Sequence, residues 1–135
     1  MRNYFALLFV ILASHTAPVF AEADLYCTIT GVSEITGNGN LEALAGKKNY
    51  YETAVGAEFI VQREKGMMAG RFVDNTNWKI NVIDAGSAQQ SYKALSTRSS
   101  GRVQSQFLEI RLQDKGNKKP FVLLAAEILH GYCTQ

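Results

Sequence analysis

Short runs of alternating hydrophobic and polar residues recur along the chain. The clearest are residues 25–30 and 78–84, where every second side chain is apolar. Because successive side chains of a β-strand point to opposite faces, this period of two predicts strands with one buried face. Weaker or longer runs predict further strands at 57–63, 67–73, 90–97, 107–113 and 120–129.

The connections between these runs are short and contain turn residues such as Gly66 and Gly116. Hairpin-length connections favour antiparallel pairing, since parallel strands need a long crossover. We therefore predict an all-β, mainly antiparallel fold, a single small β-barrel or β-sandwich of about 7–8 strands. Both architectures remain open because strand alternation is the same in each.

Residues 40–46 depart from the strand pattern. Asn40 is a residue type that caps helix N-termini, Leu41 and Leu44 have helical spacing, and Gly46 is a typical helix stop. This segment predicts one short helix.

The run 120–129 is apolar on both faces, which is typical of a central strand that is covered on both sides or lines a cavity. Glu127 interrupts it, and alternation counted back from an inward Cys133 would point Glu127 inward. A buried carboxylate needs a partner or a function, so Glu127 is a candidate polar anchor for a ligand. The alternatives are a position near a strand end, a pair with a basic residue, or a bulge that turns Glu127 outward.

Residues 1–21 resemble a secretory signal peptide, with cationic Arg2, an apolar run, and small residues before a cleavage point after Ala21. The apolar run is too short to cross a bilayer core of roughly 30 Å, which needs about 20 residues. We expect an exported protein, periplasmic or extracellular, with a single β-rich domain at 22–135 and no membrane insertion.

The chain has only two cysteines, Cys27 and Cys133. In an oxidising compartment two cysteines of a small domain usually pair. A Cys27–Cys133 disulfide would close a loop of roughly a hundred residues and raise the free energy of the unfolded chain by about 4–5 kcal/mol, because it restricts the chain's conformational entropy. It would also make the first and last strands neighbours. The alternatives are a redox pair, which favours close spacing, or a zinc site, which needs more ligands. We expect a structural disulfide, no metal and no cofactor.

The balanced charge of the chain and its lack of catalytic motifs argue against several classes of function. The chain carries 14 lysines and arginines against 12 acidic residues, and Arg2 would leave with the signal peptide, so nothing favours nucleic acid as a partner. His130, the only histidine of 22–135, could act as a general base with Glu127 or Asp84. No G-x-S-x-G, H-E-x-x-H or glycine-rich phosphate motif accompanies it. We therefore expect no catalytic residues and no enzyme.

Tyr26 and Tyr132 each precede a cysteine. If both sulfur atoms point inward, the two rings point outward from neighbouring strands. Tyrosines of this kind are typical of contact surfaces. They also stabilise sheets as cross-strand pairs without binding anything.

The "YC" at 26–27 and the segment "GSAQQSYKA", with Ser87, Ala88 and Tyr92, are similar to the periplasmic lysozyme inhibitors of the C-type family. The resemblance implies a small antiparallel barrel whose inhibitory loop leads to Tyr92.

The function expected from the sequence is a non-catalytic module that binds a protein or an envelope component. The alternatives are a carrier of small hydrophobic ligands with a cavity near Glu127, and a lysozyme-inhibitor-like protein. The candidate binding residues are Tyr26, Tyr92, Glu127, His130 and Tyr132.

Overall fold

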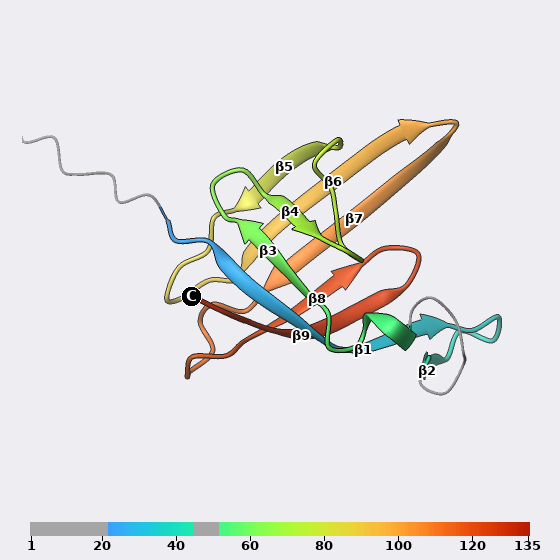
Figure 1. Cartoon of the computed structure of the whole chain (residues 1–135), viewed down its shortest axis with the longest axis horizontal. Coiled ribbons are helices and arrows are strands. Elements are labelled where there is room, and N and C mark those ends of the chain that lie inside the picture. The colour runs from blue at the N-terminus through green and yellow to red at the C-terminus, as the bar shows by residue number, and fades with distance from the viewer. Residues whose placement is uncertain (1–21, 45–51) are drawn as a thin grey trace, which may run out of the picture.

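The computed structural model describes residues 22–44 and 52–135, which form one curved antiparallel sheet (Figure 1). The predicted signal peptide lies outside the described residues. In chain order the elements are β1 (Leu25–Ile35), β2 (Leu41–Ala43), a 3-10 turn η1 (Glu52–Ala54), β3 (Glu58–Gln62), β4 (Met67–Gly70), β5 (Lys79–Asp84), β6 (Tyr92–Ser100), β7 (Arg102–Ile110), β8 (Lys119–Leu124) and β9 (Ile128–Thr134).

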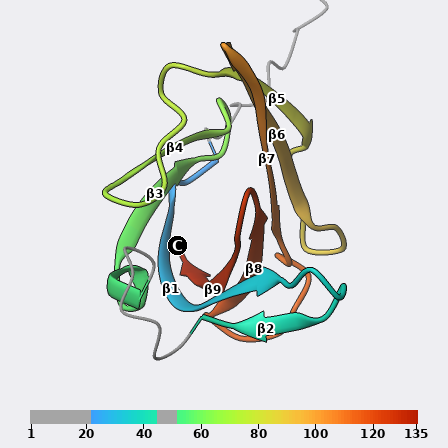
Figure 2. The same ribbon diagram turned by 90° about the vertical axis from the view of Figure 1, so that its right-hand side faces the viewer.

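The sheet curls into a nearly closed barrel. Its strand order is β4-β3-β1-β9-β8-β7-β6-β5, with β2 paired to the far end of β1, and every pairing is antiparallel. Figure 2 shows how the sheet bends round so that β4 and β5, its two edges, come to the same side. The predicted all-β antiparallel fold is confirmed, and it has the form of a barrel.

The Asn75 side chain bridges the gap in the barrel between edge strand β4 and β6, which is the neighbour of the other edge strand, β5. Asn75 is fully buried in the connection from β4 to β5. Its Oδ1 accepts the Met68 N–H at 2.6 Å, and its Nδ2 donates to Gly66 O at 3.1 Å and to Ser96 Oγ at 2.7 Å. The Asn75 side chain therefore links edge strand β4 to β6, where no strand ladder joins them in the described part of the chain.

The inner face of the barrel is packed with apolar side chains. Phe59 of β3 meets Phe121 of β8 edge to face, with ring centroids 5.3 Å apart. This geometry suits the quadrupoles of aromatic rings. Among the largest fully buried residues are Leu25, Ile29, Val61, Met68, Tyr92, Leu108, Ile110 and Leu123.

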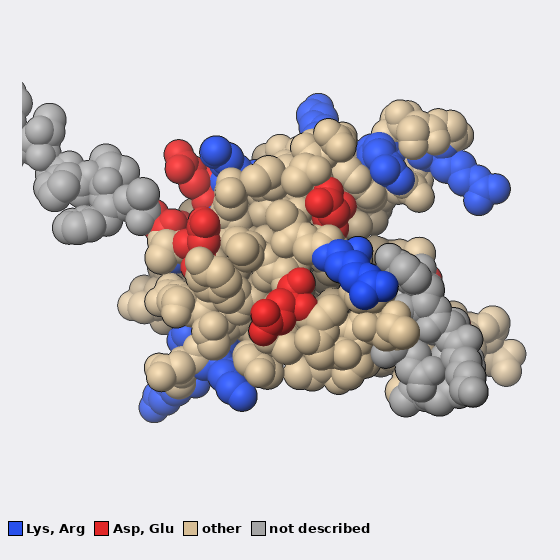
Figure 3. All heavy atoms as spheres, in the orientation of Figure 1, with Lys and Arg blue, Asp and Glu red and all other residues tan. Residues whose placement is uncertain are grey.

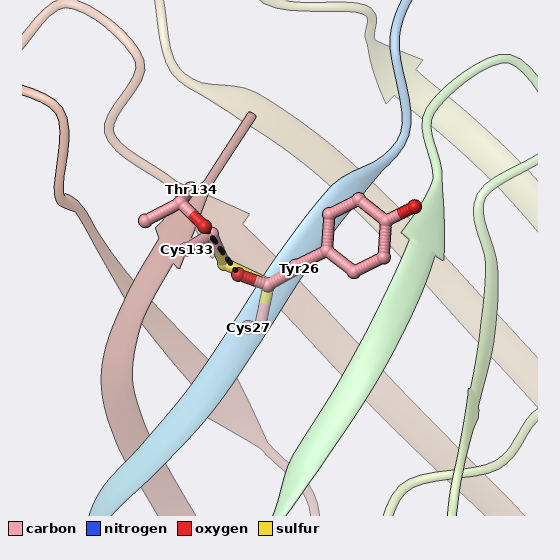
Figure 4. Close-up of a disulfide and its surroundings, with 4 residues drawn as sticks. All are labelled: Tyr26, Cys27, Cys133 and Thr134. Carbon is pink, nitrogen blue, oxygen red and sulfur yellow. Dashed lines mark hydrogen bonds between the residues drawn. A yellow bond between two sulfur atoms is a disulfide. The ribbon is translucent and has the colours of Figure 1, made fainter.

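The predicted disulfide is present between β1 and β9. Cys27 and Cys133 are directly opposite in the strand register, their Cα atoms are 3.9 Å apart, and both are buried. Figure 4 shows the bond joining the two strands, with Thr134 Oγ1 donating to Tyr26 O beside it. A covalent bond thus joins the first strand of the barrel to the last one.

The helix predicted at 40–46 is wrong for the residues that the structure describes. Leu41–Ala43 form β2, which pairs with Ser33–Ile35 of β1, and residues 45 and 46 lie outside the described residues. Asn40 does not cap a helix because both its backbone groups bond to Thr36: its N–H donates to Thr36 Oγ1 and its carbonyl accepts the Thr36 N–H. This pairing makes a tight β1–β2 hairpin.

The single strand predicted at 120–129 is also wrong. The structure has two strands there, β8 and β9, with a turn at residues 125–127 that the Ala125 N–H closes on Glu127 O at 2.9 Å. The turn contains two alanines and a glutamate, which are not turn residues, so the sequence carries no signal for it. Because the turn breaks the alternation, the count from Cys133 back to Glu127 loses its basis.

Candidate functional site

Tyr26 and Tyr132 lie on the outer face of the barrel, as the alternation around the two cysteines predicts. In the β1–β9 register Tyr26 is opposite Thr134, and Thr28 is opposite Tyr132. The two tyrosines are therefore diagonal neighbours on adjacent strands. Tyr26 is 56% exposed, Tyr132 is half-buried, and Figure 4 shows the Tyr26 ring lying toward β3, away from the disulfide.

Apolar residues extend this surface from Tyr26 toward edge strand β4. Ile60 of β3 is opposite Tyr26, and Ala69 of β4 is opposite Ile60, so the three lie in one row across three strands. They line a shallow hollow of about 240 Å³ together with Glu58. Figure 3 shows that the face over β1, β3 and β4 is mostly uncharged, with a few isolated charged groups.

A second row continues from Tyr132 onto β8. Pro120 is opposite Tyr132 in the register, and Val122 is half-buried on the same face two residues further on. Lys118 Nζ lies 4.1 Å from the centroid of the Tyr132 ring, a cation–π contact that leaves a positive charge at the border of the row. We call the two rows together the outer strip: Tyr26, Ile60, Ala69, Pro120, Val122 and Tyr132.

His130 borders the outer strip and is exposed. It is opposite Val122 on β8 and Gly31 on β1, and its ring lies directly over the Gly31 α-carbon, where any side chain would meet it at 2.4 Å. Asp84 lies on β5, four strands away in the sheet, and accepts the Gly86 N–H at 2.8 Å. The structure therefore does not bring Asp84 to His130 as an orienting partner.

Glu127 is half-buried and faces a hollow of about 450 Å³. This hollow lies between the 71–78 connection, the β8–β9 turn, and the part of the β6–β7 hairpin that projects beyond the barrel in Figure 1. Glu127 shares the hollow with Phe72, Trp78, Arg98, Gln104 and Gln106.

Polar contacts organise one wall of the Glu127 hollow. The Arg98 guanidinium lies 4.8 Å from the Trp78 ring centroid and donates through Nε to Gln104 Oε1 at 3.1 Å. Gln106 Oε1 is buried and has no hydrogen-bond partner among the described residues. A ligand in this hollow would therefore meet an aromatic ring, a cation, a carboxylate and an acceptor that lacks a donor.

Tyr92 belongs to the core, which corrects its assignment as a binding residue. Its side chain is 0% exposed, and its hydroxyl donates to Arg63 O at 3.2 Å. Burial raises the pKa of Tyr92 to about 12, because a phenolate would be poorly solvated there; Arg63 lowers the pKa and Glu22 raises it by smaller amounts. A partner cannot contact this ring in the folded domain.

The loop before Tyr92 lies at the surface. Ser87 and Gln90 exchange backbone hydrogen bonds, and Ala88, Gln89 and Gln90 are exposed. The part of the segment "GSAQQSYKA" that a partner can reach is therefore its Ser87–Gln90 turn.

Within residues 22–44 and 52–135, no group of three or more histidine, cysteine, aspartate or glutamate side chains could hold a metal ion. The same ranges contain no helix with the length and apolar character of a membrane span. Comparison with known protein families, with curated proteins and with solved structures finds no significant match.

The positions of several site residues cannot be predicted from the sequence. Ile60 and Ala69 join the outer strip only through the strand register, which alternation does not reveal. The alternation at 78–84 predicts that Trp78 is an inward-facing strand residue, yet it is half-buried beside Arg98 just before β5. The sequence indicates a partner only for Arg98: if the β6–β7 turn is centred on Gly101, Arg98 is opposite Gln104.

Proposed function

We propose that the protein is an exported, non-catalytic binding module that contacts a protein or a cell-envelope component through the outer strip. The observation that carries this proposal is the continuity of the strip: its two rows place Tyr26 and Tyr132 as diagonal neighbours, with Ile60 and Pro120 opposite them. Tyrosine combines a large apolar area with a polar hydroxyl and loses little side-chain entropy on binding, so it is favoured in contact surfaces.

The disulfide supports both parts of the proposal. Cys27–Cys133 pins β1 against β9 in the register that sets the two tyrosines side by side. A surface that is already rigid loses less freedom when it binds, which favours affinity. A disulfide is also typical of proteins that work outside the cytoplasm, in agreement with the signal peptide expected at residues 1–21.

A capture experiment tests the module. The domain 22–135 and the variant Tyr26→Ser/Tyr132→Ser are immobilised and exposed to envelope extract, and bound material is quantified by mass spectrometry. We expect partners that the wild-type domain enriches and the double variant loses. The matched control is Ile35→Ser/Ile83→Ser, which removes two apolar side chains that are 67% and 53% exposed outside the strip and outside the Glu127 hollow. Equal capture by all three proteins would refute the role of the strip.

A specific observation favours a second candidate, a small-ligand binder. The hollow beside Glu127 combines Trp78 and Phe72 with Gln106 Oε1, which has no hydrogen-bond partner in the described part of the chain. Unlike the enclosed apolar cavity expected from the sequence, this hollow is also lined by exposed polar residues, Arg98 and Gln104. The expected ligand is therefore amphipathic, with an apolar body and a hydrogen-bond donor.

Trp78 reports on this second candidate directly, because it is the only tryptophan in the chain. Titration with an amphipathic compound such as a long-chain alkylamine is expected to change its fluorescence in a saturable manner. Glu127→Gln is expected to weaken the effect, and Glu109→Gln, which changes the same charge outside the hollow, is expected to leave it intact. This function would be excluded if native mass spectrometry detects neither a co-purified nor an added ligand bound to the domain and the fluorescence does not change during the titration.

The lysozyme-inhibitor alternative concerns a different surface, the exposed Ser87–Gln90 turn. Its direct test is a C-type lysozyme activity assay with the purified domain. Inhibition that Ala88→Arg abolishes and Tyr26→Ser/Tyr132→Ser leaves unchanged would favour this alternative over the outer strip. Absence of inhibition at a large excess of the domain would exclude it.

A further inference from the structure

Arg63 occupies an unusual position for an arginine. It follows β3 directly and is only 6% exposed. Its Nη2 donates to Ala85 O at 2.8 Å and lies 3.1 Å from Glu22 Oε2. A buried guanidinium is costly unless its donors are paired, so the full set of its partners matters.

One donor of Arg63 has no partner among the residues that the structure describes. Its Nε is buried and makes no hydrogen bond with any described residue. Nε and Nη2 form one edge of the guanidinium, and this edge is suited to binding both oxygens of a carboxylate or two oxygens of a phosphate. In Arg63 the Nη2 half of the edge is used and the Nε half is unsatisfied.

Arg63 lines a hollow of about 420 Å³ with a second cation, Lys119. The other walls include Glu22, Leu112 and the Gly86–Ala88 part of the exposed loop. Lys119 is half-buried and donates to Asp114 O. The lining of this hollow therefore includes two cationic side chains, one carboxylate side chain and Gln135, the last residue of the chain. The hollow is separate from both the outer strip and the Glu127 hollow.

The two members of the ion pair differ in their access to water. The Arg63 side chain is 7% exposed, whereas that of Glu22 is 40% exposed and lies ahead of β1 at the border of the hollow. The Glu22 carboxylate itself gains little from the ion pair because it is partly exposed, so it can return to water at small cost once another anion pairs with Arg63. Arg63 cannot leave the hollow, so its charge stays available to another anion.

We propose that this hollow is a binding site for a small oxyanion, a carboxylate or a phosphate, held on the Nε/Nη2 edge of Arg63 with Lys119 as a second cation. Glu22 is the internal occupant that the ligand displaces. The site stands independently of the binding function proposed above.

Nuclear magnetic resonance of the Arg63 Nε–H tests the site in the folded domain. Acetate and inorganic phosphate are titrated separately against chloride at constant ionic strength, which distinguishes the two oxyanion classes. We expect a saturable shift of the Nε–H signal with at least one of them and none with chloride. If Glu22 occupies Arg63 nine-tenths of the time, Glu22→Gln should tighten binding about tenfold.

Three variants complete the test. Arg63→Lys is expected to abolish binding, because lysine lacks the Nε/Nη2 edge. Lys119→Gln is expected to weaken binding while it leaves the Nε–H signal observable, and it remains informative if Arg63→Lys fails to fold. Asp24→Asn is the matched control, because it removes the same charge two residues from Glu22, and it should leave the affinity unchanged. No saturable shift in either the wild type or Glu22→Gln would overturn the proposal, as would a Glu22→Gln variant that loses stability and gains no response to either oxyanion.

Discussion

The Asn75 Nδ2 donates a hydrogen bond to Ser96 Oγ at 2.7 Å, and this contact joins the β4–β5 connection to β6, the neighbour of edge strand β5. The same side chain accepts the Met68 N–H. The Asn75 side chain therefore provides, at one point, a hydrogen-bonded link of the kind that strand pairing provides elsewhere in the sheet.

Asn75→Ala is expected to lower the free energy of unfolding by at least about 3 kcal/mol. It leaves Met68 N–H, Gly66 O and Ser96 Oγ without their partner in a buried place, and each unsatisfied group costs about 1–3 kcal/mol. Urea unfolding measures the change, and Asn77→Ala, in the exposed part of the same connection, is the control. Equal midpoints for the two variants would contradict this role of Asn75.

Removal of the disulfide with Cys27→Ala/Cys133→Ala is expected to destabilise the domain by up to about 4–5 kcal/mol. The two cysteines are separated by 106 residues, and the chain-entropy estimate for a loop of this size gives that figure. Thermal unfolding with and without a thiol reductant checks the cause. The wild type should lose stability on reduction and the double variant should not respond; a wild type that is equally stable when reduced would refute the expectation.

Burial of Tyr92 is expected to make the folded domain less stable in alkali. Its pKa is raised to about 12 in the folded protein against about 10 in the unfolded chain. The unfolded state therefore loses its proton first, and the stability from this group, complete below pH 10, falls as the pH rises from about 10 to about 12, by at most about 1.4 kcal/mol per pH unit. Unfolding curves across this range measure the slope. Tyr92→Phe should flatten it, and an unchanged slope in that variant would assign the effect to other groups.

Gly131 is expected to tolerate no side chain. A Cβ atom there would lie 2.0 Å from the Thr28 carbonyl oxygen, a backbone atom that cannot turn away, so Gly131→Ala should cost at least about 1–3 kcal/mol. At Gly31 the obstacle is the exposed His130 ring, which can rotate, so Gly31→Ala should cost less and move the His130 resonances. Gly37→Ala, which meets nothing within 4 Å, is the control. Similar midpoints for all three variants would contradict this account of the β1–β9 contact.

Alternation alone predicts much of this fold. The period of two around Cys27 correctly places the disulfide inside and Tyr26 outside, because a β-strand offers only two directions to its side chains. The same reasoning fails where no residue marks a turn, as at Ala125 and Ala126 between β8 and β9. It also fails at Asn40, whose preference for helix caps was outweighed by its pairing with Thr36 in the β1–β2 hairpin.

The candidate sites were less predictable than the fold, because they depend on which strands become neighbours. Tyr26 and Tyr132 could be placed together through the disulfide, but Ile60 reaches them only by the register of β3 on β1. Arg63 and Glu22 are far apart in sequence and meet because the β3–β4 turn lies near the start of β1. Contacts of this kind can be identified only from the three-dimensional structure.

The central claim is that the outer strip is the surface through which the protein meets its partner. Site-specific photo-crosslinking in cells that produce the full-length protein tests it most directly, with the photoreactive amino acid at position 26 or 132 and, for comparison, at the exposed positions 83 and 103. The claim predicts discrete crosslinked species from 26 and 132 that are absent from 83 and 103. Crosslinks from 83 or 103, with none from 26 and 132, would contradict it.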